Sequence, residues 1–480
     1  MVPFMTGRLH WRILALVPLV AGCAVGPAYR RPAVTPPAAW KTLVGGPAWK
    51  EARPRDAVPR GAWWEVFGDA ELNLLEVQAV QTNQDLQAAA LRVIQARAIA
   101  RMAGSERFPT LEANPSYSHF QRSLSGFGSS SASPFTNDSF RVPLDLSYEI
   151  DLWGRVRRGF EAAWADAQAR EAAYQTVLLT LTADVARQSF SLRALDAELA
   201  ILQRTVELRR DALALVSSRQ EAGVATALDV ARARTELASA EAELAEATQR
   251  RAELENALAV LCGQAASEFT IAPRPLDLAP PAVPAGVPSE TLERRPDVAE
   301  AERQMAAANA RIGVAQAAFF PVVTLTGSAG YESAKLESLF DANRSFIWSL
   351  GPSLSVPLFA GGRNAANLQA AKAAHEEAAA TYRQRILESF RDVEDALAGV
   401  QAGAEQADAQ ARAVVAAREA ARLSDARYRE GLVNYLEVVD AERSRLQAER
   451  EAIRILNQRL ASTILLIKAL GGGWEDEGTL

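Results

Sequence analysis

The stretch FRVPLDLSYEIDL, residues 140–152, decides the fold of this chain. Every second residue from Phe140 to Leu152 is apolar, and most of those between are charged or polar. Because strand side chains alternate between two faces, this pattern predicts a β-strand with one apolar and one polar face. Strands of globular proteins usually have about 5–6 residues, whereas a strand that crosses an outer membrane needs about 9–11. The length favours a membrane strand over a strand of a soluble sandwich.

A second stretch of the same kind, FIWSLGPSLSVPL, occupies residues 346–358. Each stretch leads into a Gly-Arg pair, and these pairs, Gly154-Arg155 and Gly362-Arg363, lie 208 residues apart. Gly223 and Gly431 have the same separation of 208 residues. The chain is therefore a tandem duplication.

Composition excludes several classes of protein. A net charge of −6 argues against a nucleic-acid binder, which normally has a basic face. Beyond the N-terminus there is no run of 18 or more apolar residues, as a helical membrane protein would require. The sequence has 2 cysteines and 3 widely spaced histidines, so we expect no disulfide framework, metal site or cofactor. No nucleophile elbow or phosphate loop occurs, so we expect no enzyme activity.

The N-terminus predicts a secreted lipoprotein. Residues 1–22 have the basic start and short apolar run of a signal peptide. The segment Val20-Ala21-Gly22-Cys23 resembles a bacterial lipobox, which makes Cys23 the lipidated (palmitate-bearing) first residue of the mature chain. An ordinary signal peptide with an incidental cysteine is the alternative.

The remaining chain divides into two repeats and their connections. We expect the Pro- and Trp-rich arm to lie on a partner surface, and the first helix to run from Asp69 to about Glu106. The predicted divisions are an arm at 23–68, a first repeat at 69–262 with β-hairpin 110–152 (first strand about 110–120), a Pro-rich linker at 263–291, a second repeat at 292–471 with β-hairpin 322–358, and a tail at 472–480.

Long coiled-coil helices follow each hairpin. Helices are expected at about 156–221 and 226–261 and again at about 364–429 and 433–469, with turns near Gly223 and Gly431. A seven-residue repeat, such as the series from Val439 to Ile467, specifies coiled-coil packing.

Four strands per chain cannot close a barrel, and open sheet edges cannot face lipid. The chain must therefore associate around an axis or contain no membrane barrel. A coiled-coil lipoprotein or adaptor without a pore is the competing structural class, although the two alternating hairpins count against it.

Several motifs, in this order, resemble one family. They are Cys23 with Gly26-Pro27 and Tyr29; Trp63-Trp64, Phe67 and Asp69; Arg294-Arg295-Pro296-Asp297; Phe319-Phe320-Pro321; Pro357-Leu358-Phe359 with Gly361-Gly362-Arg363; and Tyr428, Gly431, Tyr435-Leu436 and Asp440-Ala441. The set resembles outer-membrane efflux channels of the TolC/OprM type, in the nodulation-T (NodT) group of lipoproteins that serve RND-type pumps.

The resemblance implies a mixed α and β membrane protein. It implies a homotrimer with a 12-stranded β-barrel in the outer membrane, continuous with a 12-helix α-barrel in the periplasm. Such a channel is a passive gated conduit that exports small molecules, and its partners are a periplasmic adaptor and an inner-membrane RND-type pump. The outer-membrane duct of a type I protein-secretion system shares this fold and is the alternative.

The resemblance also indicates functional residues. It places the periplasmic gate at Leu436, Glu437 and Asp440, and the adaptor-docking tips at Gly223 and Gly431. Three copies of Asp440 would repel one another and favour cations at the aperture. The simpler interpretation makes both acids solvated surface charges and both glycines helix-turn residues. The aromatic residues Trp153, Phe319, Phe320 and Trp348 are candidates for an interfacial girdle, or pack against the helices.

Overall fold

The computed structural model describes residues 24–32, 37, 40–41, 61–122, 135–283 and 294–472. The chain forms two compact units. The first, here called the sheet unit, comprises Met1–Pro32, Ile94–Ala169 and Ala301–Tyr382. The second, the hairpin unit, comprises Ala33–Val93, Arg170–Glu300 and Arg383–Leu480. Both units contain segments from each sequence repeat, so compactness and repetition divide the chain differently.

The helices repeat in matched pairs. Helices α5 (Arg155–Glu221) and α9 (Arg363–Arg429) have 67 residues each, and α6 (Ala227–Leu261) and α10 (Tyr435–Ala469) have 35 each. Both pairs are offset by 208 residues. The shorter pair, α4 (Gln84–Ser105) and α8 (Pro296–Ala317), has 22 residues each and an offset of 212. The remaining helices are η1 (Trp63–Phe67), α3 (Ala70–Thr82) and η2 (Leu336–Ser338).

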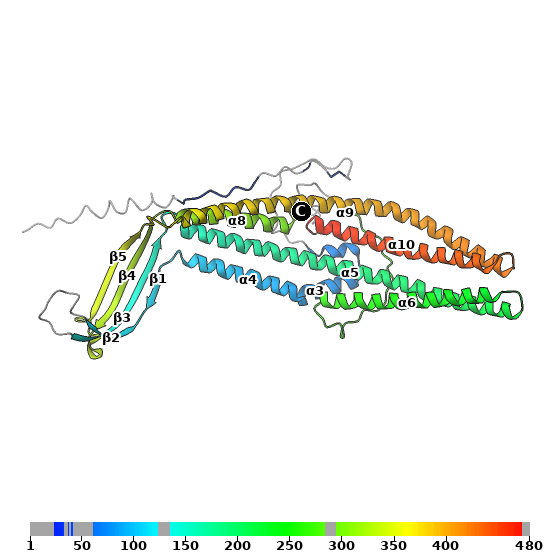
Figure 1. The fold of residues 1–480 in the computed structure, drawn as a ribbon, viewed down its shortest axis with the longest axis horizontal. Coiled ribbons are helices and arrows are strands. Elements are labelled where there is room, and N and C mark those ends of the chain that lie inside the picture. Colours follow the sequence, from blue (N-terminus) through cyan, green and yellow to red (C-terminus); the bar gives the residue numbers. More distant parts are fainter. Residues whose placement is uncertain are drawn as a thin grey trace, which may run out of the picture. The chain divides into compact units, whose positions relative to one another are not determined.

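One antiparallel sheet lies in the sheet unit (Figure 1). Its strands are β1 (Thr110–Ala113), β2 (Ser116–Arg122), β3 (Phe135–Ile150), β4 (Val322–Ser333) and β5 (Phe346–Ser355). The order is β1-β3-β4-β5, with β2 also on β3. The two hairpins therefore join where β3 of the first repeat pairs with β4 of the second.

The strand register carries the predicted alternation across the sheet. One row aligns Leu111, Leu146, Gly327 and Leu350, and the next aligns Glu112, Asp145, Ser328 and Ser349. Since neighbouring rows point to opposite faces, one face is apolar and the other polar. The apolar face is open within the chain: Leu350 and Trp348 are 65% and 72% exposed.

Three strand predictions need correction. The single strand expected at 110–120 is divided into β1 and β2 at Asn114 and Pro115, although both segments keep one register on β3. Pro115 has no N–H to donate to a ladder, which explains the interruption. Strand β3 begins at Phe135, earlier than predicted, and β5 ends at Ser355 rather than at 358.

The helix expected from Asp69 to Glu106 is also divided. The buried side chain of Asp69 caps α3 by accepting from the N–H of Leu72 at 2.9 Å. Asn83 ends α3 with an extended backbone and accepts from the N–H of Leu86 at 2.9 Å at the start of α4. An asparagine that caps the following helix satisfies the donors that the break exposes.

The core of the hairpin unit includes residues from the predicted arm. Trp63 and Phe67 pack with Phe190 of α5, and Trp40 is buried against Val393 and neighbouring side chains. These arm residues therefore pack on their own chain rather than on a partner surface. Full burial of a large apolar side chain stabilises the fold by roughly 1.5–3 kcal/mol.

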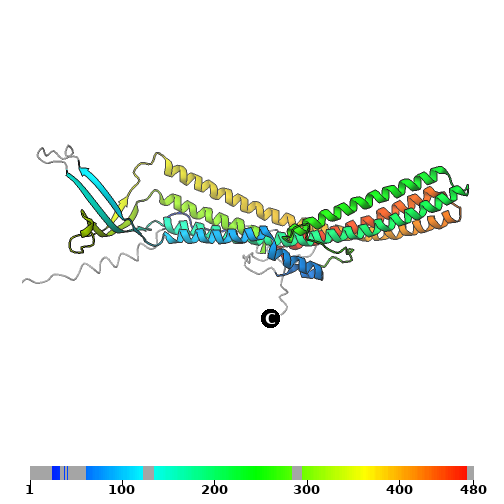
Figure 2. The ribbon, with the colours of Figure 1, turned by 90° about the horizontal axis from the view of Figure 1, so that it is seen from below.

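A coiled-coil seam joins the two helical hairpins. Figures 1 and 2 both show hairpin α5–α6 beside hairpin α9–α10. Val230 and Ala233 of α6 share a buried cluster with Val438 and Val439 of α10, and further along Leu446 packs toward Ala247. Val439 and Leu446 belong to the predicted seven-residue series from Val439 to Ile467.

Candidate gate, helix junctions and anchor strap

The two hairpin tips have the same turn. Gly223 and Gly431 have φ angles of 74° and 77°, which L-amino acids rarely adopt. The N–H of Val224 donates to the carbonyl of Arg219, and that of Leu432 donates to Arg427, both at 2.9 Å. These hydrogen bonds satisfy carbonyl groups in the last turns of α5 and α9, as in a Schellman motif. Both glycines thus have the helix-turn conformation expected of them.

Caps start the return helices. Thr226 and Asp229 form a reciprocal capping box at α6, so the carboxylate of Asp229 supports the tip locally. Asn434 caps α10 by accepting from the N–H of Glu437 at 3.3 Å. The backbone N–H of Glu437 takes part in this cap, but its side chain does not. Among the described residues of a single chain, the carboxylate of Glu437 is therefore an exposed surface charge.

The predicted gate residues share the exposed side of the first turns of α10. Leu436 is 39% exposed, and Glu437 and Asp440 are exposed as well. On the opposite side Val438 and Val439 are buried in the seam. Leu436 and Asp440 are four residues apart and therefore lie on one helix face.

An arginine ties the two tips together. The guanidinium of Arg219 on α5 lies 4.5 Å from the ring centroid of Tyr428. It donates to the carbonyls of Tyr428 and Arg429 at 3.0 and 2.9 Å, where α9 ends. Tyr428 packs in turn on Tyr435, the first residue of α10, with centroids 5.5 Å apart. A cation at a helix C-terminus also offsets the partial negative charge there.

Ion pairs cross the seam close to the gate. Arg443 of α10 binds Glu236 of α6, whose carboxylate also lies 3.2 Å from Arg209 of α5. Seven residues further along α10, Arg450 donates to Glu243 of α6 at 2.7 Å. Both α10–α6 pairs have partners 207 residues apart. No local sequence pattern pairs side chains over that distance, so our prediction missed them.

A second feature missed from the sequence is the junction between hairpin and short helices. In the first repeat, the amide of Asn83 donates to the carbonyl of Leu261, the last residue of α6, at 3.0 Å. In the second, Arg295 donates to the carbonyl of Ala469, the last residue of α10, at 3.4 Å. Asn83 and Arg295 both stand directly before the short helix, α4 or α8.

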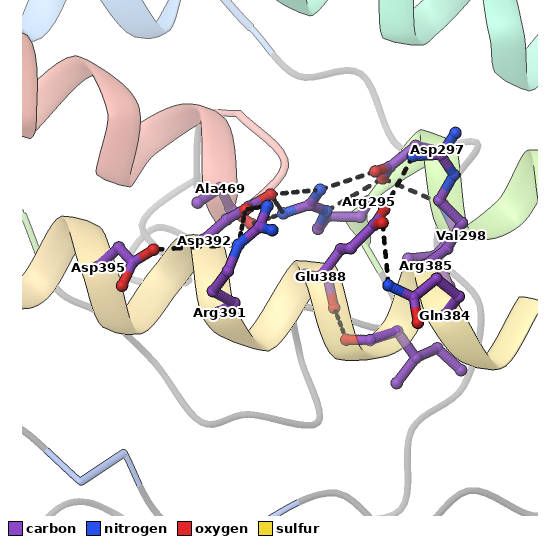
Figure 3. Close-up of polar contacts among 12 residues, drawn as sticks. Arg295, Asp297, Val298, Gln384, Arg385, Glu388, Arg391, Asp392, Asp395 and Ala469 are labelled. Carbon is purple, nitrogen blue, oxygen red and sulfur yellow. Dashed lines mark hydrogen bonds and ion pairs between the residues drawn. The ribbon is translucent and has the colours of Figure 1, made fainter.

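Arg295 also organises the charges around its junction (Figure 3). It forms a bidentate pair with Asp297, at 3.0 and 2.7 Å, and binds Asp392 of α9 at 3.1 Å. Burial opposes the charge of Arg295, but the two carboxylates hold its pKa above the usual value. The guanidinium therefore stays charged and fixes α8, α9 and α10 together.

The corner between sheet and helices carries part of the expected aromatic group. Trp153 stacks on Phe320 at 4.6 Å and donates to the carbonyl of Pro321 at 2.8 Å. Phe319 is 45% exposed beside them. Trp348 lies apart from this corner, on the open apolar face of β5, where it pairs with Ala329.

Acidic side chains at this corner form ion pairs with arginines of α5. Glu149 accepts two hydrogen bonds of 2.8 Å from Arg155, the arginine of the Gly-Arg pair. Asp151 accepts from the backbone N–H of Arg157 at 2.9 Å, in the first turn of α5. A carboxylate at that end satisfies an otherwise free helix donor.

The described segment 24–32 forms a strap across the sheet unit. The N–H of Val25 donates to the carbonyl of Trp153 at 2.9 Å, and Asn309 of α8 donates to the carbonyl of Pro27 at 3.0 Å. Arg31 donates to the hydroxyl of Tyr382 at 3.0 Å. Cys23, the predicted lipidation site, lies just outside the described residues.

Within the described ranges, no cluster of His, Cys, Asp and Glu side chains could hold a metal ion. The same ranges contain no helix that is both long and apolar enough to cross a membrane. Cys262 is free and completely buried among apolar side chains, where it packs as a small hydrophobic residue.

The sheet has one open apolar face and leads through the corner into the paired 67-residue helices, the combination expected of an outer-membrane channel. The family model for outer membrane efflux proteins matches residues 75–264 and 287–472. The chain belongs to this family of transport proteins.

Two relatives and one solved structure illustrate the likeness. The solvent efflux pump outer membrane protein SrpC of Pseudomonas putida is 36% identical over 463 residues, covering 95% of this chain and 96% of SrpC. The pyoverdine export outer membrane protein OpmQ of Pseudomonas aeruginosa is 36% identical over 464 residues, or 96% of each chain. The structure of the outer-membrane channel OprN superposes with a TM-score of 0.85 at 32% identity, covering 94% of this chain and 100% of OprN.

Proposed function

We propose that three copies of this chain form one closed conduit for efflux, with a twelve-stranded barrel and a tube of twelve helices. The observation that carries the proposal is the pair of sheet edges. Strands β1 and β2 form one edge and β5 the other, and within the described chain neither has a partner on its outer side. Unpaired strand edges cannot face lipid. Pairing the β5 edge of one copy with the β1–β2 edge of the next satisfies both.

The helix that leads into β1 offers a matching surface. Ile94, Ile99 and Met102 of α4 are 59%, 52% and 69% exposed. Exposed apolar side chains on the helix beside a free sheet edge support packing against another copy. The same contact would extend the edge pairing from the barrel into the helical tube.

Aromatic residues mark both ends of the sheet's apolar face. Tyr117 packs on Phe140 at 4.8 Å, and Tyr331 lies 5.8 Å from Phe346, all near the hairpin loops. Trp153 and Phe320 are at the opposite end, at the corner. Two aromatic belts flanking an apolar band are typical of barrels in the outer membrane.

A lipid on Cys23 would enter the membrane at that corner. Ala24, the next residue, lies against Gly154, where an added Cβ would come within 2.8 Å of the Ala24 side chain. The strap therefore supports anchoring beside Trp153. Cys23→Ser should abolish incorporation of radiolabelled palmitate, and continued incorporation would refute lipidation at this residue.

The gate would consist of a ring of Leu436 side chains with Glu437 and Asp440 beside it. In a threefold assembly the exposed side of α10 that bears them would face the narrowing end of the tube. Asp440→Ala should increase single-channel conductance in planar bilayers, because the shorter alanine side chains leave a wider aperture at the ring. The same substitution at the exposed Asp408 of α9 is the control. Equal conductance of wild type and Asp440→Ala would exclude Asp440 from the gate.

The tips would contact a periplasmic adaptor and, through it, an inner-membrane RND-type pump. Val224 and Leu432 follow the two tip glycines and are 75% and 65% exposed. A photo-crosslinker attached to Val224→Cys or Leu432→Cys should capture the adaptor in cells. The control is Val415→Cys, which is 68% exposed on α9. Capture from Val415 alone would contradict docking at the tips. SrpC is named for solvent efflux and OpmQ for pyoverdine export, yet both are 36% identical to this chain. Because similar channels thus serve different cargoes, we expect the pump to determine the cargo.

A further inference from the structure

A cavity of about 630 Å³ lies beside the Arg295 junction, between α5, α9 and α10. This volume is in the range of small-molecule sites. Leu179 and Leu465 give it apolar surface, and Thr180 and Ser462 contribute hydroxyl groups. The cavity can therefore hold a ligand with an apolar body and a polar group.

The acids that line the cavity are already paired with arginines. Asp297 and Asp392 bind Arg295, and Asp392 also accepts from Arg391 at 2.6 Å (Figure 3). Asp395 lies 3.9 Å from Arg391. An added anion would therefore meet carboxylates whose charge is largely compensated.

Lys468 is the exception among the lining charges. It is half-buried at the end of α10, and the described residues give its ammonium group neither a hydrogen bond nor a salt bridge. Burial lowers the pKa of Lys468, while the surrounding charges, Asp184, Arg187, Arg295 and Asp392, partly cancel. Asp184 is itself paired with Arg187 at 3.0 Å. A partly desolvated ammonium without a partner gains by binding an anion.

The first repeat has no equivalent of this charge. The residue 208 positions before Lys468 is Val260, which is 68% exposed. The helical hairpin therefore forms with an apolar residue at this position in the first repeat. The ammonium group occurs only in the second repeat.

We propose that this cavity binds an organic anion, with its acid group on Lys468 and its apolar body between Leu179 and Leu465. Thr180 and Ser462 would donate further hydrogen bonds to the acid group. The ligand class is a small carboxylate with an aromatic or branched apolar part. All the residues that line the cavity belong to a single chain.

Salicylate and its neutral amide, salicylamide, test the role of charge. Isothermal titration of the full-length protein in detergent should show saturable salicylate binding and at least tenfold weaker binding of the amide. Lys468→Met should weaken salicylate binding about 10- to 100-fold, as expected for loss of a charge-assisted hydrogen bond. Lys468→Arg should stay within about threefold of wild type. Lys372→Met on α9, an exposed lysine away from the cavity, is the matched control and should bind as wild type.

A second variant tests the position without removing the lysine. Leu465→Glu places a carboxylate three residues before Lys468, where it can pair with the ammonium along the helix. It should weaken salicylate binding at least tenfold. Absence of saturable binding to wild type, equal affinity for salicylamide, or wild-type affinity in both Lys468→Met and Leu465→Glu would overturn the proposal.

Discussion

Glu76 provides a quantitative test of the core of the hairpin unit. It lies on α3, has no exposed surface, and neither carboxylate oxygen has a hydrogen-bond partner among the described residues. Burial raises the pKa of Glu76 to about 9, from 4.5 in an exposed chain. The folded protein therefore keeps a proton on Glu76 at neutral pH, whereas the unfolded chain releases it.

The raised pKa makes the folded state less stable as the pH increases. The folded state binds the extra proton between pH 4.5 and about 9, so stability falls across that range. At about 1.36 kcal/mol per pH unit, the cost is roughly 1.4 kcal/mol at pH 5.5 and roughly 4 kcal/mol at pH 7.5. Glu76→Met removes the titrating group and retains a similar volume. It should be more stable than wild type at pH 7.5, and this advantage should decrease by roughly 3 kcal/mol at pH 5.5.

Thermal unfolding of the detergent-solubilised protein, followed by calorimetry between pH 5.5 and 8.5, measures this difference. The matched control is Glu253→Met, an exposed glutamate on α6. The stability of Glu253→Met should change with pH in parallel with that of wild type. If the stability of Glu76→Met also changes in parallel with that of wild type between pH 5.5 and 8.5, the Glu76 carboxyl is not buried as the structure has it.

Substitutions at Asp69, Arg295 and Glu236 test contacts that fix the helices. Asp69→Asn keeps the α3 cap but leaves the buried Arg193 without its closest counter-charge, and should cost about 3 kcal/mol in denaturant unfolding; Asp69→Ala should cost about 1 kcal/mol more. Arg295→Met should lower the unfolding temperature far more than Arg391→Met, because only the former charge is buried; equal effects would contradict the junction. Glu236→Gln should speed amide hydrogen exchange in the second tip, because its pair with Arg443 is lost, and unchanged exchange would show that this pair does not restrain the tip.

Periodicity explains which parts of the fold could be predicted. The alternation in residues 140–152 and the 208-residue offset are carried by the sequence itself, since strand faces and helix seams depend on spacing within one element. The matched lengths of α5 and α9 agree with that offset. The polar and apolar rows of the sheet follow from the same alternation.

The break at Asn83 could not be seen from periodicity, because helical spacing continues on both sides of it. An asparagine followed by Asp85 is a weak start signal, and the hydrogen bond from Asn83 to the carbonyl of Leu261 is a tertiary contact that the sequence does not reveal. The arm was expected to lie on a partner surface because its tryptophans lie among prolines. Trp40 and Trp63 instead fill the chain's own core.

The candidate gate illustrates the same limit. Spacing places Leu436 and Asp440 on one face of α10, and the structure exposes that face. The pair of Arg443 with Glu236 joins residues 207 positions apart, so only the packing of α10 on α6 identifies it. Side chains brought together by tertiary packing leave no local pattern in a single sequence.

The two free sheet edges of one chain can be satisfied by other copies of the same chain. Native mass spectrometry of the protein extracted from outer membranes counts those copies directly. The expected result is one dominant species containing three chains, which would carry twelve strands when β1 and β2 are counted as one edge strand. A stable species with one chain that still conducts ions in bilayers would contradict it.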